Sequence, residues 1–278
     1  MTRFVTACVL GGLVFWTSQA CAGWVIEQEM TGGASGRQRL MVQANRMKTL
    51  QLDGAGTPTA AFLVDLDAQT ITHVDYVNRR YMTSTAQEYA GAMRSMQARA
   101  SGQMAEAMRQ MKDQLEKMPP EQRRMVEEMM RKQGAGSAAG GTEACREPNV
   151  EMRPTNQRET IAGYAATRYD MLVDGKVQSE MWMAKDLPIW RELDRAKMEK
   201  FSREMASASC SGGRTSMDLS WSRTGEGYPV RMVHRGEGPG VTMETVSAES
   251  RNVAASEFQP PAGFVKNTLA EMMGGAVR

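Results

Sequence analysis

Apolar and polar residues alternate in short stretches along the first part of the chain. Segments with a period of two, such as Gln38 to Val42 and Phe62 to Leu66, are separated by clusters of turn-forming residues such as Asp53-Gly54-Ala55-Gly56. This alternation is typical of strands, and strands that follow one another without intervening helices favour antiparallel pairing. We therefore expect residues 23–84 to form the first part of an antiparallel sheet.

The pattern becomes helical after residue 84. β-Branched residues nearly vanish between 87 and 133, and apolar residues recur every three or four positions, as on one face of a helix. Pro119-Pro120 interrupts this pattern, because proline cannot continue a helix interior. The pattern predicts a helical hairpin over 85–133, inserted between two parts of the sheet. Its apolar face comprises Met93, Met96, Ala100, Met104, Met108, Met111, Leu115 and Met118.

Strand-like segments resume in the last part of the chain. The glycine-rich stretch 134–144 is typical of a flexible linker. Residues 145–266 then combine period-two segments and turn dipeptides such as Asp174-Gly175 with a helical pattern over 187–207. Residues 267–278 form a short tail. Strands and helices in this order predict an α+β fold.

The first 22 residues have the pattern of an export signal. Arg3 is followed by an uncharged run that is too short to span a bilayer, and Ala20-Cys21-Ala22 fits the recognition pattern of a signal peptidase. We expect cleavage after Ala22, release into the periplasm and no transmembrane segment in the exported chain. The alternative is a lipoprotein anchored through Cys21.

The amino-acid composition gives information on charge, cysteine and methionine. The 34 Lys and Arg residues nearly balance the 32 Asp and Glu residues, which argues against a nucleic-acid-binding surface. Removal of the signal leaves Cys145 and Cys210, and two cysteines in an oxidising compartment most simply form one disulfide. The 25 methionines outnumber the 6 Phe, 6 Tyr and 5 Trp residues together. Methionine is therefore the unusual feature of this composition.

Catalytic motifs are missing from the sequence. His73 and His234 lie within strand patterns, and the chain has no Gly-x-Ser-x-Gly elbow, no P-loop and no His-x-x-His spacing for zinc. We predict that the protein is not an enzyme and that it needs no cofactor.

Three interpretations of the methionine pattern remain open. The first is an apolar face that packs on the sheet or contacts a partner or acyl chains, since methionine is flexible and adaptable. The second is capture of a soft metal such as Cu(I) by Met93, Met96, Met104, Met108 and Met111, because thioethers prefer soft ions. The third is buffering of oxidants through reversible sulfoxide formation.

Several segments resemble a known family. They are Trp24 to Met30 (WVIEQEM), Glu159 to Tyr169 (ETIAGYAATRY), Glu180 to Pro188 (EMWMAKDLP), Gly227 to Met232 (GYPVRM) and Phe258 to Phe264 (FQPPAGF). Together they resemble a bacterial exported family of unknown function that is similar to the periplasmic lipoprotein carriers. The resemblance covers most of the chain except the methionine-rich hairpin. It implies a curved antiparallel sheet, an unclosed half-barrel, with helices across its concave side.

A curved sheet of this kind offers an apolar concave face, for which the candidate ligand-binding residues are Trp24, Met181, Trp182, Met183 and Trp221. Because alternate residues of a strand face opposite ways, Met181 and Met183 share a face that Trp182 does not. We expect a periplasmic protein that binds a lipid or other apolar ligand, or an envelope protein, through the half-barrel and its helical lid. Copper handling or oxidant buffering is the alternative.

Overall fold

The computed structural model describes residues 23–33, 35–116, 119, 149–206, 227–235 and 240–272. Within these ranges, one 12-stranded sheet has the order β12-β6-β5-β4-β3-β2-β1-β11-β10-β9-β8-β7. Its strands are β1 (Trp24–Gly32), β2 (Gly36–Gln43), β3 (Arg46–Leu52), β4 (Pro58–Asp65), β5 (Thr70–Asp75), β6 (Arg80–Thr85), β7 (Val150–Ile161), β8 (Tyr164–Val173), β9 (Lys176–Ala184), β10 (Tyr228–His234), β11 (Val241–Ser250) and β12 (Val265–Lys266). The helices are α1 (Ala86–Glu116), η2 (Ile189–Glu192), α3 (Arg195–Ala206), η4 (Ala255–Phe258) and α4 (Leu269–Met272).

Tight turns connect the hairpins of this sheet. Two consecutive residues with positive φ occur at Ala44-Asn45, at Ala162-Gly163 and at Asp174-Gly175. This pair of angles is characteristic of the two-residue turns that match the twist of antiparallel strands. Local turn chemistry therefore explains the turn at Ala162-Gly163 and the turn predicted at Asp174-Gly175.

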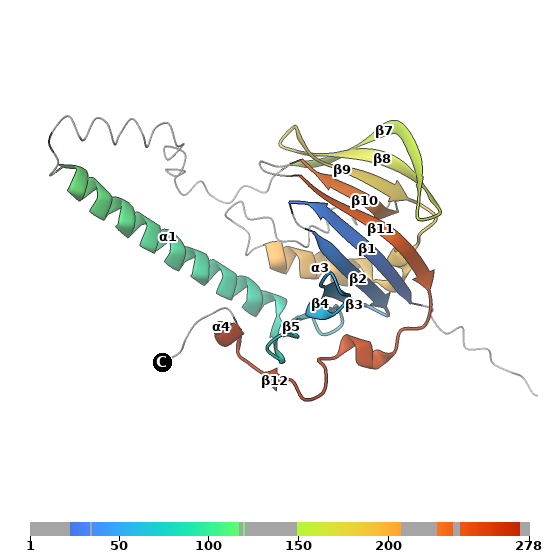
Figure 1. Cartoon of the computed structure of the whole chain (residues 1–278), viewed down its shortest axis with the longest axis horizontal. Helices are drawn as coiled ribbons and strands as arrows, with labels where there is room; N and C mark the ends of the chain where they lie inside the picture. The colour runs from blue at the N-terminus through green and yellow to red at the C-terminus, as the bar shows by residue number, and fades with distance from the viewer. Residues whose placement is uncertain are drawn as a thin grey trace, which may run out of the picture.

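The two parts of the sheet meet where β1 pairs with β11, in a register that runs from Trp24 opposite Ser250 to Gly32 opposite Val241 (Figure 1). Gly32 has a φ of 98°, and a Cβ atom at this position would lie 2.0 Å from the carbonyl oxygen of Gly240. Only glycine fits so close a contact in the left-handed region. The joint between the two parts therefore depends on this residue.

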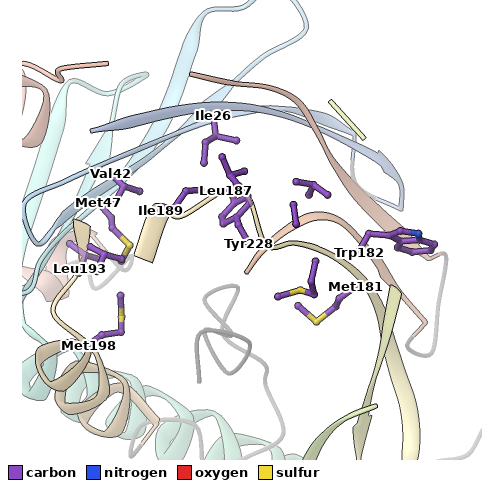
Figure 2. Packing of buried hydrophobic residues seen from close by; sticks show 14 of the residues in the cluster. Ile26, Val42, Met47, Met181, Trp182, Leu187, Ile189, Leu193, Met198 and Tyr228 are labelled. Atoms are coloured by element: carbon purple, nitrogen blue, oxygen red, sulfur yellow. The ribbon is translucent and has the colours of Figure 1, made fainter. Parts of the chain in front are cut away.

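Strand β7 and strand β12 form the two ends of the sheet, so the barrel is not closed. The sheet arches over a core in which Ile26, Val42 and Met47 point inward toward Leu187, Ile189 and Met198 (Figure 2). Helices η2 and α3 thus lie across the concave side, and the predicted α+β half-barrel is confirmed.

The helical pattern over 187–207 corresponds to two separate elements. Helix η2 ends at Glu192 and is followed by Leu193, which has an extended backbone, and α3 begins after Asp194. The Asp194 carboxylate accepts a hydrogen bond from the backbone N–H of Lys197 at 3.0 Å, which satisfies one of the free donors of the first turn. This cap starts α3 in a new direction beneath the sheet.

The C-terminal segment covers the other face of the first sheet part. Val253 joins a second apolar cluster with Val25, Met41, Leu50 and Val74, and it is nearly fully buried. Phe258 and Phe264 pack against the same cluster, and the Lys48 ammonium pairs with the Glu257 carboxylate at 2.9 Å. The first part of the sheet is therefore apolar on both faces.

Helix α1 corresponds to the first half of the expected helical hairpin. The rest of the hairpin beyond Glu116, the linker 134–144, the cysteines Cys145 and Cys210, and the signal 1–22 lie outside the described residues. Among the helices in the described ranges, none has the length and apolar character needed to cross a membrane.

Candidate functional site

The predicted ligand-binding residues on β9 divide between the two faces of the sheet. Met181 and Met183 are 0% and 1% exposed and belong to the concave core, whereas Trp182 points away from the hollow (Figure 2). Trp24 is partly buried against the same core, and Trp221 lies outside the described residues. Both methionines are thus covered by the protein itself and stabilise the fold. Their assignment to ligand binding stays a prediction.

Trp182 is covered on the outer face by two arginines. The guanidinium carbons of Arg168 and Arg231 lie 5.6 and 5.2 Å from the centroid of its ring, a distance at which cations attract aromatic faces. Arg231 also donates to both carboxylate oxygens of Glu159, at 2.6 and 2.9 Å, and to Glu244 at 2.6 Å. The hydrogen bond from Arg231 lowers the pKa of Glu159. Trp182 therefore forms part of a cross-strand ion network rather than an open apolar surface.

A small polar cluster interrupts the apolar concave face. Gln28 donates from Nε2 to the hydroxyl of Tyr228 at 3.2 Å, and Gln38 donates from Nε2 to Oε1 of Gln28 at 2.8 Å. Burial raises the pKa of Tyr228, so its hydroxyl stays protonated. The side chain of Thr245, which is paired with Gln28 across β1 and β11, is buried as well. These neutral groups therefore form a buried polar spot on the concave face.

The two histidines lie on separate strands. His73 on β5 stacks on Phe62 with ring centroids 4.6 Å apart and planes inclined by 3°, and His234 on β10 contacts the hydroxyl of Ser179 at 3.2 Å. Burial lowers the pKa of His73, and the nearby Asp75 carboxylate opposes this effect. In the described ranges, no three His, Cys, Asp or Glu side chains are grouped as metal ligands.

The lowered pKa of His73 predicts a loss of stability in mild acid. An unfolded histidine titrates near pH 6.5, whereas folded His73 takes up its proton at lower pH. As the pH falls below about 6.5, the unfolded state therefore binds more protons than the folded state, and the free energy of unfolding decreases. Urea unfolding at pH 7.5, 6.5 and 5.5 measures how the free energy of unfolding depends on pH. His73→Gln is expected to flatten this pH dependence, and an unchanged pH dependence in His73→Gln contradicts the assignment.

Helix α1 is anchored to the body of the protein through its N-terminal turns. Glu88 and Thr85 form reciprocal hydrogen bonds: the Thr85 N–H donates to Oε2 of Glu88 at 2.8 Å, and the Glu88 N–H donates to Oγ1 of Thr85 at 3.1 Å. The hydrogen bonds that the N–H and the hydroxyl of Thr85 donate to the Glu88 carboxylate lower the pKa of Glu88. Ala86 and Ala90 are fully buried, and Tyr89 packs against the concave core. The helix start is thus fixed by both a capping box and packing.

Beyond these turns, α1 runs away from the sheet (Figure 1). Every position from Ser101 to Met111 is exposed, and the exposed fractions are 62% for Met104, 38% for Met108 and 44% for Met111. Because these three are spaced by four and three residues, they share one side of the helix, which we call the methionine face. An apolar surface left uncovered in this way is typical of an interaction site.

Comparison with known proteins places these observations in a wider context. A family model described as "Domain of unknown function (DUF4412)" matches residues 78–264. No curated protein matches the chain.

Three solved structures that the chain matches show distant similarity to it. A conserved protein of Thermus thermophilus, described as uncharacterized, is 8% identical with a TM-score of 0.42, and the alignment covers 89% of this chain and 91% of that one. MucB is 11% identical with a TM-score of 0.37, over 88% of this chain and 60% of MucB. The MucA/MucB complex of Pseudomonas aeruginosa matches over 90% and 60% of the two chains, with 11% identity and a TM-score of 0.37. Similarity at this level does not bear on function.

Proposed function

The chain belongs to the DUF4412 family, and from that premise we propose that it is an exported, non-enzymatic binding protein that engages an envelope protein through the methionine face of α1. Membership agrees with the resemblance to an exported family of unknown function. The description of the family carries no activity, so the support for this function comes from the residues of the chain.

The exposure of the methionine face is the observation that carries the proposal. Met104, Met108 and Met111 lie on a 31-residue helix and are at least 38% exposed, although large apolar side chains are usually buried. Covering the exposed parts of three methionine side chains contributes roughly 2–4 kcal/mol to association. A contribution of this size tightens binding by one to three orders of magnitude.

The concave side of the sheet is a less suitable site for an apolar ligand than the exposed methionine face, because it is already packed. Met181, Leu187, Ile189 and Phe201 are at most 1% exposed, because η2, α3 and the loop before them fill this side. A ligand in the hollow would have to displace these residues from a packed core. We therefore favour a protein partner at α1 over an acyl chain under the sheet.

Site-specific photocrosslinking in the native host tests the proposal. A photoreactive residue introduced at Met108 is expected to crosslink to one discrete envelope protein, whereas the same residue at Glu106, on the opposite side of the helix, gives no such product. The triple substitution Met104→Gln, Met108→Gln and Met111→Gln is expected to reduce the amount of the envelope partner that copurifies with the protein at least tenfold.

The matched control lies on the opposite side of α1. The triple substitution Gln103→Ala, Glu106→Gln and Gln110→Ala removes two exposed amides and one negative charge and leaves the methionine face intact. This variant is expected to retain the partner. Equal recovery of the partner by both triple variants, or copurification of the protein with lipid alone, contradicts the proposal.

A further inference from the structure

The choice of methionine over other apolar residues on α1 is not explained by apolar contact alone. Six of the seven large apolar residues between 93 and 118 are methionine, and the seventh is Leu115. Leucine has the same helix propensity as methionine and a similar gain from burial. The core of the sheet uses Val64, Leu66 and Ile71 alongside methionines such as Met47 and Met181. The helix differs in its almost exclusive use of methionine among its large apolar residues, which gives it a row of sulfur atoms.

The spacing of the methionine face brings three of these sulfur atoms within reach of one point. Met104 and Met108 are four residues apart and Met108 and Met111 are three apart, so the Cβ atoms of each pair lie about 5–6 Å from each other. Methionine side chains are unbranched and flexible, and all three are exposed to solvent. Three thioethers can therefore converge on one ion above Met108 without any change in the helix backbone.

No acidic side chain of the described helix α1 shares the methionine face. The acidic residues Glu106 and Asp113 fall on the opposite side of α1 according to the helical repeat. A ligand set made only of neutral thioethers selects soft ions, because hard cations such as Mg²⁺ and Ca²⁺ require oxygen ligands.

We propose that Met104, Met108 and Met111 form a three-thioether site for a soft monovalent cation, Cu(I) or its analogue Ag(I). Binding changes no oxidation state and releases no proton, because a thioether carries no proton to lose. The site uses the same three residues as the proposed interface, but the two can be tested separately, because leucine replaces methionine in an apolar contact and cannot bind the ion.

Methyl resonances of methionine provide the test on the full-length protein. The chain is labelled with [methyl-¹³C]methionine and titrated with Ag(I), and three resonances are expected to shift and to saturate at one equivalent. Single Met→Leu substitutions at 104, 108 and 111 assign these resonances. Titration with Zn²⁺ is expected to shift none of the three. Shifts confined to other methionines, such as Met30 or Met243, overturn the site.

Competition for Cu(I) with a chromophoric chelator, under reducing and anaerobic conditions, gives the affinity. The triple substitution Met104→Leu, Met108→Leu and Met111→Leu is expected to weaken Cu(I) binding at least 100-fold, and Met108→Leu alone at least tenfold. Met96→Leu is the matched control, because Met96 is exposed on the same helix two turns away, and it is expected to change the affinity less than twofold. Equal affinity of the wild type and the triple leucine variant refutes the proposal.

The leucine and glutamine variants separate the metal site from the protein interface. If the triple leucine variant still copurifies with the partner that the crosslink identifies, and loses Cu(I), the metal site is supported. If it retains both, the metal site is wrong and the partner interface stands. Circular dichroism of each variant verifies that α1 remains helical.

Discussion

Replacing Phe201 with alanine is expected to lower the free energy of unfolding by about 3–5 kcal/mol. Phe201 is 1% exposed and belongs to the concave core together with Leu187 and Met198. Truncation removes the largest side chain that holds α3 beneath the sheet, and the surrounding residues can collapse only partly into the cavity left behind. Urea unfolding, followed by far-UV circular dichroism and tryptophan fluorescence, measures the loss.

Lys200→Ala is the control for this experiment. Lys200 precedes Phe201 on α3 and is exposed to solvent, so its truncation is expected to change stability by no more than about 0.5 kcal/mol. If the two substitutions lower the free energy of unfolding equally, the concave core does not hold α3 in place, and the packing described for this helix is wrong.

A second large loss of stability is expected from a substitution on the opposite face of the sheet. Val253→Asp places a carboxylate in the cluster formed with Val25, Met41, Leu50 and Val74, where the valine is 6% exposed. An unpaired charge in such a cluster is expected to lower the free energy of unfolding by about 3 kcal/mol or more. The same urea unfolding experiment at pH 7 measures it, since the carboxylate is then ionised.

Val246→Asp is the matched control, because it makes the same exchange at a valine that is 56% exposed. Val246 lies at the irregularity of β11, between Thr245 and Ser247, which both pair with β1. Its substitution is expected to be nearly neutral. A neutral effect at Val253 as well indicates that the C-terminal segment does not stay on the sheet in solution.

Local sequence chemistry predicted much of the fold. Turn residues such as Asp174-Gly175 specify their own backbone angles, and the period-two pattern of each strand indicates its buried face. The alternation of Met181, Trp182 and Met183 also predicted which of the three would face away from the hollow, as Figure 2 shows for Met181 and Trp182. The curvature of the sheet came from the family resemblance rather than from these patterns.

Features that depend on strand register were not accessible from the sequence. Arg168 and Arg231 meet over Trp182 because β8 and β10 both pair with β9, in registers that place all three residues opposite one another. No local pattern specifies this alignment. The covering of the first sheet part by Val253 and Phe258 was missed as well, although the consecutive apolar residues Phe62-Leu63-Val64 are typical of a strand buried on both faces.

The joint between β1 and β11 has a consequence for how the protein is made. Strand β1 is among the first described residues to leave the ribosome, but its partner strand β11 comes late in the chain, since Gly32 in β1 pairs with Val241 in β11. Until β11 is available, β1 presents an unpaired edge, which is a template for association with other chains. Nascent chains that stop before residue 241 should therefore aggregate, whereas the complete chain closes this edge within itself.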